Sequence, residues 1–293
     1  MNIYERAFLF PCLGEVLIGI VCVPEIAAST GVLIVVGGPQ YRVGSHRQFL
    51  LLSRSLAHAG FPVMRFDFRG MGDSHGETRN FENVEDDIGA AIDAFVADCP
   101  NIERIVLWGL CDAASASLLY FNSKHDRRVC GMFLLNPWVR SEASLAKTHV
   151  KHYYWRRLQQ REFWTKLLSG RAKVAHAYRG LFSNLLLAQR GDNKESKDFR
   201  GCMANALSGF DGPIMFVLSE NDYTAKEFQQ FVSDSPEWKG LLSSPRVTTL
   251  SLAEADHTFS SVVWRERVAQ CTVDWLRQSG LGLVADRVTG SNI

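Results

Sequence analysis

The sequence lacks several features that would mark other classes of protein. Its seven cysteines stand singly among 293 residues, with no C-x-x-C pair, so nothing indicates a zinc or dithiol site. An odd, dispersed set of cysteines is typical of a reducing compartment. No apolar run approaches the ~20 residues of a membrane-spanning helix, and the N-terminus lacks the basic start and apolar core of a signal peptide. We therefore expect a soluble cytoplasmic protein without a transmembrane segment.

Other absences narrow the range of ligands. The formal net charge is only +1, which gives no argument for binding nucleic acid. No G-x-G-x-x-G sequence opens a helix after an early strand, so we expect no dinucleotide cofactor. No set of histidines, cysteines or carboxylates has the spacing of metal ligands, so we expect no metal. What remains is an ordinary globular composition, with 46% hydrophobic and 22% charged residues.

Apolar runs alternate with amphipathic segments along most of the chain. The first two runs, residues 6–12 and 15–23, flank Leu13-Gly14 and predict a β-hairpin. Further strands are predicted at 32–36, 62–67, 105–108, 129–135, 213–219 and 246–252, with helices at 48–59, 83–97, 112–121, 224–232 and after 259. The alternation predicts right-handed crossovers and a mostly parallel sheet with helices on both faces.

One stretch has the pattern of a strand, a sharp turn and a helix. An apolar run ends at Gly109, and Cys111 follows two residues later, before small residues suited to a helix. This is the pattern of a nucleophile elbow, usually G-x-S-x-G, with Cys111 at the nucleophile position and Ala113 at the last glycine position. The alternative is a buried free cysteine in an ordinary turn, since cysteine is among the most buried residue types.

Two unusual loops follow other predicted strands. Residues 37–47 are rich in glycine and polar groups, and so are residues 68–76. Sites in open α/β sheets lie beyond the carboxyl ends of the strands, so both loops and Cys111 are expected at one edge. This convergence favours the catalytic interpretation of Cys111.

A candidate base and acid follow later strands. His257 comes directly after the last predicted strand and is the candidate base. Asp222 follows the strand at 213–219, where a carboxylate can fix the imidazole tautomer, and is the candidate orienting acid. Glu220 is a rival acid, and Asp256, beside the histidine, is a second alternative.

The order of nucleophile, acid and histidine, each after a successive strand, is that of the α/β-hydrolase fold. Residues 67–74, Asp-Phe-Arg-Gly-Met-Gly-Asp-Ser, resemble the D-x-R-G-x-G-x-S loop of that superfamily. Residues 37–47 and 107–112 are more closely similar to the first of two hydrolases associated with exosortase A systems. Those bacterial loci combine protein sorting with exopolysaccharide production. The resemblance implies an α/β-hydrolase fold and a setting, and it defines no reaction.

An oxyanion hole needs two backbone N–H groups. Asp112, directly after the nucleophile, is expected to supply one. The loop at 37–47 should supply the other, and because Pro39 has no N–H, the donor is Gly38 or Gln40, with Gln40 favoured. Candidate ligands for an anionic part of the substrate, with solvated charges as the alternative, are Arg42, His46 and Arg47.

The alternation stops at residues 136–138. Residues 140–208 are helical in character, and between 140 and 205 aromatic residues are set among 14 Lys/Arg and only 5 Asp/Glu. We expect a hydrolase core over 1–139 and 209–293, with a helical lid inserted at 140–208. The positive charge suggests that an acidic acyl carrier protein or coenzyme A delivers the substrate, with a membrane surface as the alternative.

A thiol nucleophile favours activated acyl substrates. Its acyl adduct is a thioester, which stays reactive toward water, amines and alcohols. We therefore expect cleavage of an ester or thioester through an acyl-enzyme, with acyl transfer by the same triad as one alternative. A catalytically silent scaffold is the other, kept open by Ala113 in place of glycine.

Overall fold

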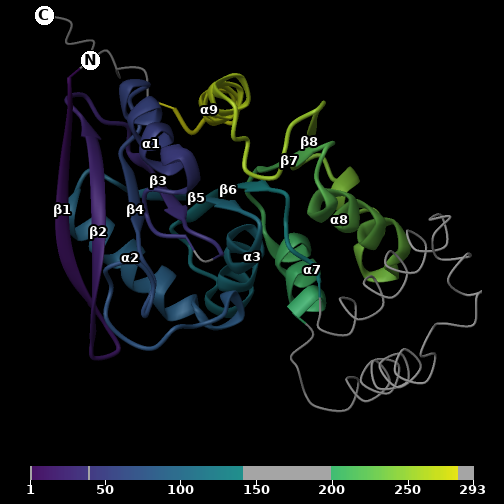
Figure 1. Ribbon diagram of the computed structural model, residues 1–293, viewed down its shortest axis with the longest axis horizontal. Coiled ribbons are helices and arrows are strands. Elements are labelled where there is room, and N and C mark those ends of the chain that lie inside the picture. The colour runs from purple at the N-terminus through teal and green to yellow at the C-terminus, as the bar shows by residue number, and fades with distance from the viewer. Residues whose placement is uncertain (1, 39, 141–198, 283–293) are drawn as a thin grey trace, which may run out of the picture. The chain divides into compact units, whose positions relative to one another are not determined.

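The computed structural model describes residues 2–38, 40–140 and 199–282, which build an eight-stranded sheet (Figure 1). The strand order is β1-β2-β4-β3-β5-β6-β7-β8. Strands β1 (Ile3–Cys12) and β2 (Glu15–Pro24) form an antiparallel hairpin, and β2 also pairs antiparallel with β4 (Val63–Phe66). All other neighbouring strands are parallel. The predicted hairpin and the mostly parallel sheet are confirmed.

The remaining elements follow the predicted alternation closely. The other strands are β3 (Thr30–Val35), β5 (Arg104–Leu110), β6 (Val129–Leu135), β7 (Ile214–Ser219) and β8 (Val247–Leu252). The helices are α1 (Gln48–His58), α2 (Glu85–Asp98), α3 (Asp112–Lys124), α7 (Phe199–Gly209), α8 (Tyr223–Asp234) and α9 (Val262–Gln278). Among the described residues, no helix combines the length and the apolar character that crossing a bilayer requires.

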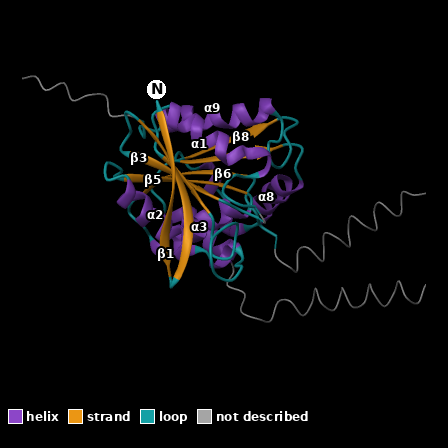
Figure 2. Cartoon of the chain, turned by 60° about the vertical axis from the view of Figure 1, so that its left-hand side comes forward, coloured by secondary structure: helices purple, strands orange, loops and turns teal. Residues whose placement is uncertain are grey.

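Helices cover both faces of the sheet (Figure 2). Helices α1 and α9 pack together on one face, and α2, α3 and α7 lie on the other. Because both faces are covered, β3, β4 and β7 are buried along their whole length. An aromatic row fills the α1/α9 face: Phe49 packs on Trp108, which stacks on Phe133. The core therefore holds β5 rigidly just before Cys111.

The chain divides into two compact units. Residues 1–138 and 199–293 form the first unit, called the body, and residues 139–198 form the second unit. Most of the predicted lid, together with its aromatic and basic residues, lies outside the described residues. Its last part, 199–208, falls in α7, which packs against α3 within the body.

Candidate active site

Strand β5 passes into α3 through a strained turn at Cys111. Its φ of 64° and ψ of −124° are values that a residue with a side chain rarely adopts. Gly109 makes the turn possible, because a Cβ there would lie 2.6 Å from the carbonyl oxygen of Ala113. The Cys111 N–H donates to the Leu135 carbonyl at 2.8 Å. The thiol is only half-buried, so this is an elbow with an accessible sulfur.

His257 and Asp222 lie beside Cys111. The Nδ1 of His257 is 2.8 Å from Oδ2 of Asp222, and the same ring hydrogen-bonds the Cys111 side chain. The Asp222 carboxylate also caps α8, where it accepts hydrogen bonds from the N–H groups of Thr224 at 3.2 Å and Ala225 at 3.1 Å. Residues more than a hundred positions apart in sequence thus meet at the carboxyl edge of the sheet.

The two other candidate acids are placed elsewhere. Glu220 is exposed to solvent. The carboxylate of Asp256 accepts hydrogen bonds from the N–H groups of Thr258 and Ser260 and from the Ser260 hydroxyl. Of the three acids considered, Asp222 is the one in contact with the imidazole.

The electrostatics of the pair favour a charged imidazole. The hydrogen bond to Asp222, followed by the one to Cys111, raises the pKa of His257 to about 10. Burial opposes ionisation of Asp222, but the hydrogen bond and charge of His257 outweigh it and lower the pKa of that carboxyl.

The side chain of Asp112 fastens the loop after β3 to the elbow. Its Oδ2 accepts a hydrogen bond from the Gly38 N–H at 2.9 Å. Gly37 has no room for a Cβ, which would collide with Oδ1 of Asp112. Burial raises the pKa of the Asp112 carboxyl. The Gly38 N–H is thus already bonded to Asp112. Gln40, whose N–H is the favoured donor, is held by its side chain, which accepts a hydrogen bond from the Ser45 N–H at 3.0 Å.

The three candidate anion ligands differ in their surroundings, because one is ion-paired and mostly buried and the other two are exposed. The guanidinium of Arg42 pairs with Asp67 and, at 2.7 Å, with Asp73, and its side chain is only 12% exposed. Arg42 thus ties the loop at 37–47 to the loop at 68–76. His46 and Arg47 are exposed, with φ values of 53° and 60°. A role for any of them in substrate binding stays a prediction.

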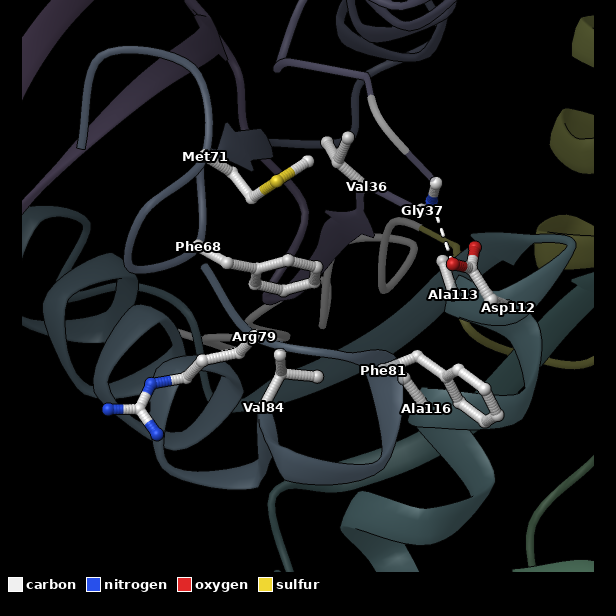
Figure 3. Close-up of a pocket in the computed structure, with 11 residues that line it drawn as sticks. Val36, Gly37, Phe68, Met71, Arg79, Phe81, Val84, Asp112, Ala113 and Ala116 are labelled. Atoms are coloured by element: carbon white, nitrogen blue, oxygen red, sulfur yellow. Dashed lines mark hydrogen bonds between the residues drawn. The ribbon is translucent and has the colours of Figure 1, made fainter. Parts of the chain in front are cut away.

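A small apolar cavity lies beside the first turns of α3 (Figure 3). Its volume of about 20 Å³ is roughly that of one water-sized sphere. Asp112 contributes a carboxyl to the wall, and the guanidinium of Arg79 points away from it. The apolar part of the wall consists of Val36, Phe68, Met71, Phe81, Val84, Ala113 and Ala116.

Sequence analysis assigned no role to Asn136 or Ser219. Both are almost completely buried, at 0% and 2% exposure, at the carboxyl ends of β6 and β7. A polar residue that closes an apolar strand was the available signal, but such residues also begin ordinary loops. Within the part of the chain that the structure describes, no group of three or more histidine, cysteine or acidic side chains could hold a metal ion.

The sheet, the elbow and the order of the side chains at the strand ends define an α/β hydrolase. A family model described as serine aminopeptidase, S33, matches residues 30–180, just over half of the chain. The chain belongs to this family of α/β hydrolases. The matched region includes the elbow, where the family name implies serine and this chain has Cys111.

Solved structures share the fold at low sequence identity. The esterase Pf2001 of Pyrococcus furiosus is 16% identical, with a TM-score of 0.64, over 95% of this chain and 92% of that chain. Est1E of Butyrivibrio proteoclasticus, solved with ferulic acid bound, is 11% identical, with a TM-score of 0.61, over 93% and 98%. An α/β serine hydrolase homologue from Coxiella burnetii is 16% identical, with a TM-score of 0.55, over 91% and 96%. A search among curated proteins found no match.

Proposed function

We propose that this protein is a hydrolase that cleaves an ester or thioester with Cys111 as nucleophile, His257 as base and acid, and Asp222 as orienting carboxylate. The observation that carries the proposal is the imidazole of His257, which contacts Asp222 at 2.8 Å and also hydrogen-bonds the Cys111 side chain. The strained backbone of Cys111 supports it, because such strain gathers at functional sites.

The proposed reaction begins with attack of the Cys111 thiolate on the acyl carbon. A C–S bond forms, and the carbonyl π electrons move to oxygen, which accepts hydrogen bonds from the N–H groups of Asp112 and Gln40. When the intermediate collapses, the bond to the leaving group breaks, and the leaving oxygen or sulfur takes a proton from the His257 imidazolium. The neutral imidazole then removes a proton from water, which attacks the thioester carbonyl. The C–S bond breaks, the carboxylic acid leaves, and the Cys111 thiolate and the His257 imidazolium are restored, while Asp222 holds the ring throughout.

The charge of His257 supports a thiol nucleophile. A serine hydrolase needs a neutral imidazole to remove the hydroxyl proton. With a pKa of about 10, His257 holds its proton at neutral pH, which suits a thiolate and imidazolium pair instead. The cysteine in place of the family's serine is consistent with this environment.

The cavity in Figure 3 supports a short apolar acyl group. It lies beside Asp112, the proposed oxyanion donor, and is lined mostly by apolar side chains. Its volume of about 20 Å³ leaves little room, so we propose that acetyl and propionyl esters react faster than octanoyl esters. Phe81 and Met71 border the cavity and are the side chains whose truncation should admit longer chains.

The biological setting is proposed from sequence alone. The resemblance of residues 37–47 and 107–112 to exosortase-associated hydrolases supports a role beside exopolysaccharide production, and the dispersed cysteines support the cytoplasm. The basic excess between 140 and 205 supports an acidic acyl carrier or coenzyme A as the source of the acyl group. Passage of the acyl group to an acceptor other than water would use the same thioester.

Mass spectrometry after brief exposure to p-nitrophenyl acetate tests the proposal. We expect an acetyl adduct confined to Cys111, formed well before any of the other six cysteines reacts. The adduct should form at least about a hundredfold more slowly in His257→Ala, which loses the imidazolium. Labelling of Cys111 no faster than that of the other cysteines would rule out the enzymatic role and favour the scaffold.

A further inference from the structure

A buried amide lies where β6 ends, between the strands that present the nucleophile and the acid. Asn136 is 0% exposed and has a φ of 44°. Its Nδ2 donates to the Ser219 hydroxyl at 2.9 Å and to the His257 carbonyl at 3.2 Å. Its Oδ1 accepts a hydrogen bond from the Ser219 N–H at 2.8 Å. Both amide hydrogens and the amide oxygen are therefore engaged.

Ser219 extends these hydrogen bonds to the loop that carries His257, residues 253–261, called the histidine loop below. It is the last residue of β7, three positions before Asp222. Its hydroxyl donates to the Asp256 carbonyl at 3.0 Å while it accepts from Asn136. The two consecutive carbonyls of Asp256 and His257 are thus held by Ser219 and Asn136. One pair of side chains connects the end of β7 with the backbone that carries the imidazole.

The residues on either side of Asn136 hold the elbow. The Leu135 carbonyl accepts the Cys111 N–H at 2.8 Å, and the Trp138 N–H donates to the Cys111 carbonyl at 3.3 Å. The Ser115 hydroxyl, one turn into α3, donates to the Trp138 carbonyl at 2.7 Å. The segment 135–138 therefore bonds to the backbone of the nucleophile as well as to the acid strand and the histidine loop.

We propose that Asn136 and Ser219 are positioning residues, which set the distance from the His257 imidazole to Asp222 and Cys111 by fixing the backbone of residues 256 and 257. This inference rests on the proposed function, in which those three side chains act together. Because these side chains are buried, a polar group that loses its hydrogen-bond partner has no water to replace it, and the folded protein is destabilised. The histidine loop cannot shift without breaking the bonds at both carbonyls.

Ser219→Ala is the most conservative test. It removes the hydroxyl that holds the Asp256 carbonyl and leaves one Asn136 amide hydrogen without its acceptor. The matched control is Ser117→Ala, since Ser117 is also fully buried and also donates to a backbone carbonyl, that of Ala113, but lies away from the histidine loop. Asn136→Leu is a second variant, which keeps the approximate shape of the side chain, adds no charge and removes the donor to the His257 carbonyl.

The first readout is the NMR titration of the His257 ring, assigned with His257→Gln. In Ser219→Ala and Asn136→Leu we expect its midpoint to fall by about one pH unit, because the ring moves away from Asp222. Ser117→Ala should titrate like the parent protein. The second readout is turnover of p-nitrophenyl acetate, where kcat should fall about tenfold with KM nearly unchanged, because a misplaced base slows the chemical step.

The two readouts separate this proposal from the proposed function. The titration needs no turnover, so it decides the positioning role even if Cys111 proves unreactive. An unchanged His257 titration in both variants would overturn the positioning role, and so would an equal shift in Ser117→Ala. In either case rapid labelling of Cys111 in the parent protein would leave the proposed hydrolase standing.

Discussion

The charge of a single residue, His257, determines which nucleophile the proposed mechanism can use. Because its pKa is raised to about 10, the ring holds its proton at neutral pH and cannot accept one from a hydroxyl. We therefore expect Cys111→Ser to lower kcat/KM for p-nitrophenyl acetate by about a thousandfold at pH 7. The defect should shrink as the pH rises and the ring becomes neutral, and it should do so below pH 10, because the variant lacks the hydrogen bond and charge of Cys111 that help to raise this pKa. A serine variant as active as the parent at pH 7 would contradict this account of the imidazole.

The same residue makes folding stability depend on pH. The pKa of His257 in the folded protein, about 10, lies above the value of about 6.5 for an unfolded chain. The folded state therefore binds the proton more tightly, so the stabilisation is complete below about pH 6.5 and is lost as the pH rises through about 10. We expect the melting temperature of the parent protein to fall more steeply between pH 7 and 10 than that of His257→Gln. Parallel curves would show that His257 gains no proton affinity on folding.

Among the elements, the turn between β5 and α3 leaves no space for a side chain at Gly109. A Cβ at Gly109 would lie 2.6–2.8 Å from the backbone of Ala113 and Ala114. Gly109→Ala should lower the free energy of unfolding by about 1–3 kcal/mol, or the melting temperature by roughly 2–10 °C, and displace Cys111. Gly209→Ala is the matched control, because a Cβ at the end of α7 meets nothing within 4 Å. Equal melting temperatures for the two variants would show that the turn has more space than its packing indicates.

At the scale of the elements, the sequence predicted the features that depend on hydrophobic periodicity and on the order of the strands. The run at 129–135 is β6 residue for residue, and the residues after β5, β7 and β8 meet as the order of the strands requires. Contacts between loops that are distant in sequence could not be predicted in this way. Arg42 is charged and polar in sequence, but its partners Asp67 and Asp73 can be recognised only once two loops are folded together. The amide of Asn136 was missed for the same reason, since its partners are 83 and 121 positions away.

For the whole molecule, the uneven distribution of charge is the property to test. The 14 Lys/Arg against 5 Asp/Glu between 140 and 205 leave the rest of the chain with 18 Lys/Arg and 26 Asp/Glu. If an acidic carrier delivers the acyl group, changing Arg156, Arg157, Arg161 and Lys166 to glutamate should reduce kcat/KM about tenfold or more for an acyl carrier protein substrate. For p-nitrophenyl acetate it should change less than about twofold. Equal losses on both substrates would exclude docking of the carrier at these residues.

The half-buried thiol of Cys111 also makes this enzyme vulnerable to oxidants. Burial raises the pKa of the thiols of Cys22, Cys99 and Cys130 to about 11, which keeps them in the form that peroxide attacks slowly. Cys111 is half-buried, and its side chain hydrogen-bonds the protonated imidazole of His257. A sulfenic acid there would remove the proposed nucleophile, so we expect the amount of working enzyme to follow the supply of cellular reductants.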